Sequence, residues 1–126
     1  MRCPVKNSKE VIVIDDDLEI LDLIHTIIKT VDEHACIHLF DNTEMALEEL
    51  EYSQDMIDLI ITDYNVPELN GDGFAREAKK ITDCPIILYS GSDILNDTRI
   101  DGLFINKISK GNLKGLQIQI EEIFDS

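Results

Sequence analysis

Short apolar runs alternate along the chain with segments whose apolar residues recur at helical spacing. The runs are rich in β-branched residues and contain few polar positions, which is typical of strands that are covered on both faces. They predict five strands, at residues 11–14, 35–40, 57–62, 86–89 and 103–105. After each run, apolar residues spaced three and four apart predict a helix, most clearly in the segment that follows the first run.

The alternation of strands and helices predicts the α/β class, with one doubly wound parallel sheet and helices on both faces. A length of 126 residues fits a single domain, 1–126, which is large enough to bury a core. The pattern places that core at about 10–124 and makes 1–9 an N-terminal extension.

The fourth helical segment, residues 93–100, is the weakest of the set. It contains Asn96, Asp97 and Thr98, which are poor helix formers. We therefore expect a short or irregular fourth helix.

Polar side chains stand at the carboxyl ends of four predicted strands. Asp15 and Asp16 follow the first strand, Asp63 the third, Ser90 the fourth and Lys107 the fifth. In open parallel sheets the functional site lies outside these ends. Because the first and third strands are neighbours in a doubly wound sheet, the three aspartates are expected to converge.

Converging carboxylates repel one another unless a cation neutralises them. Mg²⁺ prefers oxygen ligands, accepts one or two carboxylates and keeps a place for a phosphate oxygen. Lys107 can offset the charge of a phosphoryl oxygen, Ser90 can donate a hydrogen bond to it, and Asp63 can act as the nucleophile. These groups predict magnesium-dependent phosphorylation of Asp63.

Four segments in order carry a family resemblance: VIVIDDD, IITDYNVPELNG, ILYSGS and LFINK. With them the chain resembles the response-regulator receiver domains of two-component signalling, including the stand-alone chemotaxis type, from about residue 11 to 124. The resemblance implies a flavodoxin-like (βα)5 fold with strand order 2-1-3-4-5. It also implies Mg²⁺ held by Asp15, Asp16, Asp63 and the backbone carbonyl of Asn65, with Asp63 as the phosphoacceptor.

The resemblance implies a switch as well. Ser90 matches the switch Ser/Thr position, and Phe104, three residues before Lys107, matches the aromatic that moves with it. Two features depart from the family pattern: Ile108 follows the lysine where proline is usual, and the separation between Ser90 and Lys107 is short. The shortening falls on the fourth helix and leaves the usual output face in doubt.

Composition narrows the range of partners. The chain has 26 Asp and Glu against 11 Lys and Arg, and the net charge of −15 argues against binding to nucleic acid or an anionic membrane. The N-terminus MRCPVKNSKE lacks the apolar run of a signal peptide, and no run is long enough to span a membrane. We expect a cytoplasmic protein.

The cysteines and histidines predict no further metal site. Cys3, Cys36 and Cys84 are odd in number and without CxxC spacing, which favours a reducing compartment over a disulfide framework. His34 and His38 are spaced like zinc ligands. They alternate within a predicted strand, however, and the sequence offers no obvious carboxylate or cysteine partner beside them.

The leading hypothesis is a phosphoacceptor receiver in a two-component or phosphorelay system. Its partners would be a sensor histidine kinase or phosphotransfer protein and a downstream protein target, since no output domain follows in the sequence. The alternative is a pseudo-receiver, a binding module that works without phosphorylation. A magnesium phosphohydrolase would need a cap and more chain, and a flavin site would need a phosphate-binding loop where Asp15 and Asp16 stand.

Overall fold

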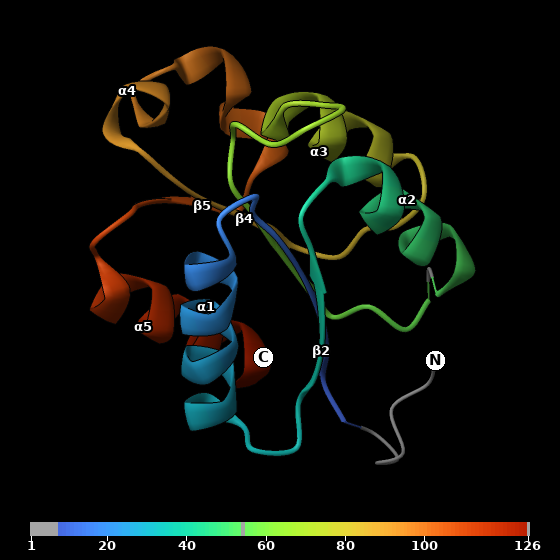
Figure 1. Cartoon of the computed structure of the whole chain (residues 1–126), viewed down its shortest axis with the longest axis vertical. Coiled ribbons are helices and arrows are strands. Elements are labelled where there is room, and N and C mark those ends of the chain that lie inside the picture. Colours follow the sequence, from blue (N-terminus) through green and yellow to red (C-terminus); the bar gives the residue numbers. More distant parts are fainter. Residues whose placement is uncertain (1–7, 54, 126) are drawn as a thin grey trace.

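The computed structural model describes residues 8–53 and 55–125, which form a five-stranded parallel sheet with helices on both faces (Figure 1). The strand order is β2-β1-β3-β4-β5, as predicted. The strands are β1 (Glu10–Ile14), β2 (Cys36–Phe40), β3 (Leu59–Thr62), β4 (Ile86–Ser90) and β5 (Asn106–Ser109).

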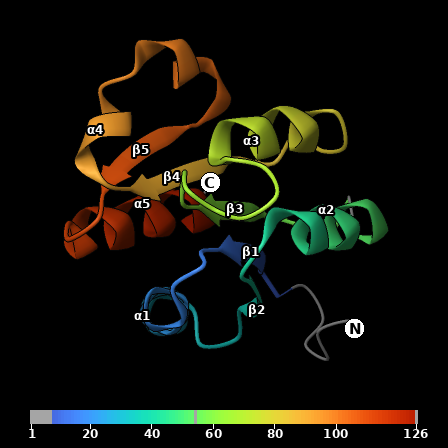
Figure 2. The same ribbon diagram turned by 45° about the horizontal axis from the view of Figure 1, so that its top comes forward.

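Two pairs of helices cover the sheet. The α-helices are α1 (Leu18–Val31), α2 (Thr43–Tyr52), α3 (Gly71–Lys79), α4 (Ser92–Leu95) and α5 (Leu113–Asp125). In Figure 2, α1 and α5 lie against one face of the sheet, and α2 and α3 lie against the other. The predicted fold is therefore confirmed, with a separate apolar core on each face.

The inner strand β1 shows how the sequence supplies both cores. Val11 and Val13 point into the core beneath α1 and α5, whereas Ile12 and Ile14 point into the core beneath α2 and α3. Successive side chains of a strand face opposite sides, so a strand covered on both faces is apolar at every position.

The segment after β4 is irregular, as expected. Helix α4 has only four residues and is followed by a 3₁₀ helix at Thr98–Leu103. Asp97 starts the 3₁₀ helix because its side chain accepts a hydrogen bond from the Arg99 N–H at 3.0 Å.

The predicted fifth strand at 103–105 is wrong. Leu103 ends the 3₁₀ helix, the Phe104 side chain is buried, and the strand begins at Asn106, which pairs with Ile87. β5 is an edge strand with polar residues at three of its four positions, so it carries little of the apolar signal that marks a covered strand. The apolar run and the strand are therefore displaced from each other by three residues.

Residues 1–7 of the predicted N-terminal extension, with Cys3, lie outside the described residues. Within the described ranges, no helix combines the length and the apolar composition needed to cross a bilayer.

Candidate functional site

The carboxyl ends of β1, β3 and β4 bring Asp15, Asp63 and Ser90 together. The side chains of all three are buried, Asp15 at 1% and Asp63 at 7% exposure. Asp63 is fixed across the sheet because its backbone N–H donates to the carbonyl of Ile14 at 3.0 Å. These contacts bring Asp15, Asp63 and Ser90 to one edge of the sheet.

The turn from β1 into α1 holds the acidic pair in place. Asp15 Oδ1 accepts a hydrogen bond from the Asp17 N–H at 2.9 Å, and Asp17 Oδ1 accepts one from the Glu19 N–H at 3.0 Å. Asp17 is thereby the N-cap of α1. This arrangement buries Asp15 and leaves Asp16 exposed.

The Asp63 carboxylate has a specific partner for each oxygen. Oδ1 accepts hydrogen bonds from the Ser90 hydroxyl at 2.6 Å and from the Tyr64 N–H at 2.7 Å. Oδ2 accepts one from the ammonium of Lys110 at 2.9 Å. A carboxylate held by three donors has a fixed orientation, which is what a positioned nucleophile or ligand requires.

Lys110, and not Lys107, supplies the positive charge of the site. The Lys110 Nζ lies 2.9 Å from Oδ2 of both Asp15 and Asp63. Lys107 instead forms an ion pair with Asp101 and donates to the backbone carbonyl of Asp97 at 3.5 Å.

The prediction that Lys107 enters the site is therefore wrong. The error arose because the fifth strand lies three residues later than predicted. Lys107 lies within β5, and Lys110 is the first residue after it. The residue after the site lysine is therefore Gly111 and not Ile108. Gly111 has a φ of +102°, and its N–H donates to the Tyr89 hydroxyl at 3.3 Å. That left-handed conformation favours glycine.

The electrostatics of the site are those of an acidic pocket with one cation. Burial raises the pKa of Asp15, and the nearby charge of Asp63 raises it further, while the hydrogen bond from the Asp17 N–H and the adjacent Lys110 ammonium act in the opposite direction. Burial alone would lower the pKa of Lys110, but its ion pairs with Asp15 and Asp63 leave it above the ordinary value. Lys110 therefore stays charged at neutral pH.

Three carboxylates remain close enough to share a metal ion. One ligand oxygen each from Asp15, Asp16 and Asp63 lies within 4.8 Å of the other two. Asp15 Oδ2 is buried and has the Lys110 ammonium beside it, but accepts no well-formed hydrogen bond from the described residues. A buried carboxylate oxygen left in this state fits a position beside a hard cation.

Comparison with known proteins shows to which family the chain belongs. The sequence model of the response regulator receiver domain family matches residues 11–103. The chain belongs to this family. Receiver domains are regulatory parts of two-component systems and not classical enzymes. The match ends before β5, so Lys110 is identified by its geometry.

Individual relatives are distant. The probable transcriptional regulator ycf27 of Cyanophora paradoxa is 27% identical over 97 residues, and the alignment covers 77% of this chain and 38% of that protein. The chain thus spans well under half the length of this curated relative.

Solved structures of receiver domains share the fold at low identity. A receiver domain protein from Clostridium thermocellum is 24% identical with a TM-score of 0.82, covering 93% of this chain and 94% of that one. A CheY-like receiver domain protein from Methanospirillum hungatei is 21% identical with a TM-score of 0.79, covering 94% and 95%.

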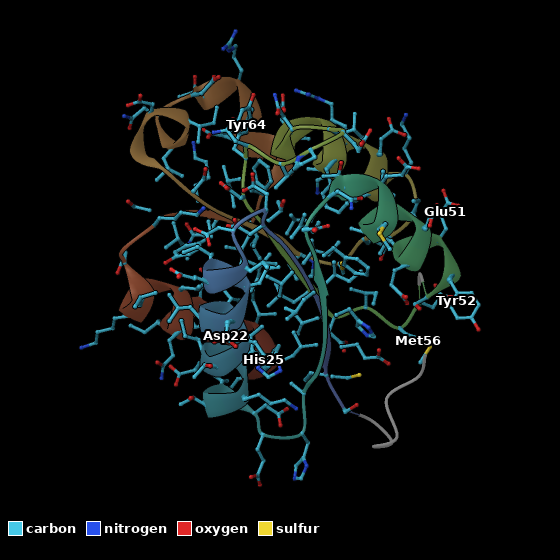
Figure 3. The ribbon with its side chains drawn as sticks, viewed as in Figure 1. Asp22, His25, Glu51, Tyr52, Met56 and Tyr64 are labelled. Carbon is cyan, nitrogen blue, oxygen red and sulfur yellow. The ribbon has the colours of Figure 1, made fainter. Side chains whose placement is uncertain are left out.

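The receiver's surface is hollowed beside the loop that joins β3 to α3. A pocket of about 400 Å³ lies between the β3–α3 loop and the segment that follows β4. It is lined by Tyr64, Asn65, Ser90, Gly91, Asp93, Ile94 and Asp97. Figure 3 labels Tyr64, which stands at the same end of the molecule as α4. Asn65 is exposed in this loop, two residues after Asp63.

The structure places Phe104, the predicted switch aromatic, in an apolar core. Its side chain is buried in the core beneath α2 and α3. The predicted switch role rested on a separation of three residues from Lys107. With Lys110 in the site, the residue three positions before the lysine is Lys107, which is not aromatic.

Two residues of the receiver support the loop after Asp63. A Cβ on Gly71 would lie 2.7 Å from the Asp63 carbonyl oxygen, so this glycine permits a close approach of two backbone segments. The buried Thr43 was missed by sequence reasoning: its hydroxyl donates to the Pro67 carbonyl at 2.9 Å and accepts from the Leu69 N–H at 2.8 Å. A Thr at a helix start signals only capping, so the sequence did not reveal this contact.

Proposed function

We propose that this receiver domain accepts a phosphoryl group on Asp63 in a magnesium-dependent reaction. The observation that carries the proposal is the setting of the Asp63 carboxylate, which faces the Ser90 hydroxyl and the Lys110 ammonium beside the acidic pair at Asp15 and Asp16. A nucleophile, a hydroxyl donor, a cation and a set of oxygen ligands are thus combined in one place.

The residues present fit Mg²⁺. Asp15 and Asp63 would hold the ion, Asp16 would contribute from the exposed side, and the backbone carbonyl of Asn65 is the fourth protein ligand implied by the family resemblance. All of these donors are oxygen atoms, which Mg²⁺ prefers. The bound ion would offset the negative charge of the transferred phosphoryl group.

The chain's own groups account for the transfer. An oxygen of the Asp63 carboxylate forms a bond to phosphorus as the bond from phosphorus to the donor's leaving atom breaks, and the electron pair departs with that leaving atom. The Lys110 ammonium offsets charge on the phosphoryl oxygens, and the Ser90 hydroxyl donates a hydrogen bond to one of them. Such transfer depends mainly on positioning and electrostatic stabilisation.

The partners follow from the same proposal. The phosphoryl donor is a sensor histidine kinase or a phosphotransfer protein, and the output is contact with a downstream protein. The net charge of −15 disfavours nucleic acid and anionic membranes as direct partners of this chain. The transcriptional role in the name of the relative from Cyanophora paradoxa belongs to a longer protein.

A pseudo-receiver is the second candidate. The observations that favour it are the four-residue α4 and the charged Lys107 three positions before Lys110. Both lie outside the phosphoacceptor site, which retains its acids, its hydroxyl and its lysine.

Intact mass after incubation with phosphoramidate or acetyl phosphate distinguishes the two. Wild type should gain one phosphoryl group only when Mg²⁺ is present, and Asp63→Asn should gain none. Asp93→Asn is the matched control, because Asp93 lines the neighbouring pocket without belonging to the acidic cluster. A gain in Asp63→Asn would mean that another residue is the acceptor. No gain in wild type, from small donors or from a histidine kinase, would favour the pseudo-receiver.

A further inference from the structure

A second cluster of ligand-type side chains lies at the opposite end of the sheet, where the strands begin. It consists of Glu10 on β1 with Cys36 and His38 on β2. Glu10 is paired with Cys36 across the two parallel strands, and His38 is paired with Ile12. In Figure 1, β2 lies at the side of the sheet that α2 covers.

The pleat of the sheet directs all three side chains to one face. Glu10 is two residues before Ile12 and therefore points toward the side of α2 and α3, as Ile12 does. Cys36 and His38 are also two residues apart and share a face with their partners on β1. Their convergence is fixed by strand register and not by a mobile loop.

The distances suit a small cation. His38 Nε2 lies 3.0 Å from Glu10 Oε1 and 3.9 Å from Cys36 Sγ, and the three ligand atoms all lie within 4.8 Å of one another. Ligands of a tetrahedral zinc ion are separated by roughly 3.3–3.8 Å, given bond lengths of about 2.0–2.3 Å. Movements of no more than about 1 Å would bring the three atoms into a zinc ligand sphere.

The Glu10–His38 pair is largely buried, unlike a surface ion pair. The side chains of Glu10 and His38 are 9% and 15% exposed. The start of β1 is held as well, because the Glu10 N–H donates to Asp58 Oδ2 at 2.8 Å. A histidine alone would be enough to satisfy the buried carboxylate. The thiol on the same face adds a soft ligand that the Glu10–His38 pair does not need.

Of His38 in β2 and His34 just before it, only His38 belongs to the cluster. His34 is 66% exposed and lies beside Glu33, so it takes no part in the cluster. His38 has the carboxylate and the cysteine that were not evident from sequence. Glu10 is 28 positions away, and only the pairing of β1 with β2 brings it there.

We propose that Glu10, Cys36 and His38 form a binding site for Zn²⁺ or a similar divalent cation that accepts thiolate and imidazole ligands. The three residues leave a fourth position for water or a small ligand. The Asp15, Asp16 and Asp63 cluster contains only oxygen ligands, so the two clusters favour different metals. A metal at Glu10, Cys36 and His38 would join the edge strand β2 to β1 and stabilise the fold by binding only its native form.

Titration with Co²⁺ in excess Mg²⁺ tests the site directly. The excess Mg²⁺ would occupy the oxygen cluster in place of Co²⁺. Co²⁺ bound through a thiolate gives a charge-transfer absorption band that carboxylates cannot produce. Wild type should develop this band with a stoichiometry of one, and added Zn²⁺ should remove it. Zn²⁺ should also raise the Tm of wild type. Absence of the band and of the Tm shift would overturn the proposal.

Matched variants assign the ligands. Cys36→Ser and His38→Gln should each abolish the band, and both should keep the fold because serine is close in size and glutamine can still donate to Glu10; circular dichroism checks this. His34→Gln and Cys84→Ser should keep the band. Burial raises the pKa of the Cys84 thiol to about 11, so it stays protonated. Cys3→Ser should also keep it. Loss of the band in Cys84→Ser or Cys3→Ser, with retention in Cys36→Ser, would overturn the assignment.

Discussion

The ammonium of Lys110 lies 2.9 Å from Asp63 Oδ2, although 47 positions separate the two residues. The same nitrogen lies 2.9 Å from Asp15 Oδ2. The Lys110 side chain is 28% exposed, so it reaches from the edge of the site toward two buried acids. It is therefore placed beside the phosphoryl group that the proposed reaction would add to Asp63.

Replacing each of the two lysines near the end of β5 tests this placement. Lys110→Met should reduce the rate of Asp63 phosphorylation by small donors by about 10²-fold, the usual effect of removing one charged or hydrogen-bonding group from a transition state. Lys107→Met should leave the rate unchanged, because Lys107 contacts Asp101 and not Asp63. The initial rate is measured by intact mass, and a reversed ranking of the two variants would return the role to Lys107.

The raised pKa of Asp15 predicts a pH-dependent cost to stability. Its carboxyl binds a proton more tightly in the folded chain than in the unfolded chain, chiefly because it is buried. Between its ordinary pKa and the raised value, the native state therefore holds more protons, and the free energy of unfolding falls as pH rises. Without Mg²⁺ at neutral pH, Asp15→Asn should be more stable than wild type.

Urea unfolding between pH 4 and 8, with and without Mg²⁺, checks the Asp15 prediction. The stabilising effect of Asp15→Asn should shrink at acid pH, where wild-type Asp15 is protonated. It should also shrink in Mg²⁺, because an ion bound at the proposed site would stabilise the native state of wild type. An Asp15→Asn protein that is less stable than wild type at neutral pH without Mg²⁺ would contradict the burial argument.

The two glycines at the start of α3 should respond in opposite directions to alanine. In Gly71→Ala the new Cβ would meet the Asp63 carbonyl oxygen at 2.7 Å, and the required backbone shift should cost about 1–3 kcal/mol. Gly73→Ala meets only Leu69 side-chain atoms at 3.6 Å and should gain up to about 1 kcal/mol from helix propensity. Thermal or urea unfolding measures both. Equal effects would show that the contact of Gly71 with Asp63 is not limiting.

Phe104 is expected to act as a core residue. Phe104→Ala should lower the free energy of unfolding by about 3–5 kcal/mol, because it removes a buried aromatic ring. Phe104→Leu should recover much of that loss and should be phosphorylated like wild type. A Phe104→Leu protein with normal stability but an altered response to phosphorylation would restore the switch role.

The sequence determined the architecture because its information is local. Apolar runs that fill most of a strand, as in β1 and β3, are typical of strands covered on both faces, and their alternation with helical patterns leads to the doubly wound sheet. The chain direction then places whatever follows a strand at one edge, so the amino-acid order alone assigns Asp15, Asp63 and Ser90 to a common site. The weak helix propensity after β4 likewise predicted the short α4.

Tertiary structure alone decided which lysine enters the site and which histidine lies beside a carboxylate and a thiol. β5 is an edge strand with little apolar signal, so only its pairing with β4 fixes the end of the strand and distinguishes Lys110 from Lys107. His38 meets Glu10 only through the register of β1 and β2, which the apolar pattern does not specify. Register depends on backbone hydrogen bonds between distant segments, and a shift of one residue would send every side chain to the other face.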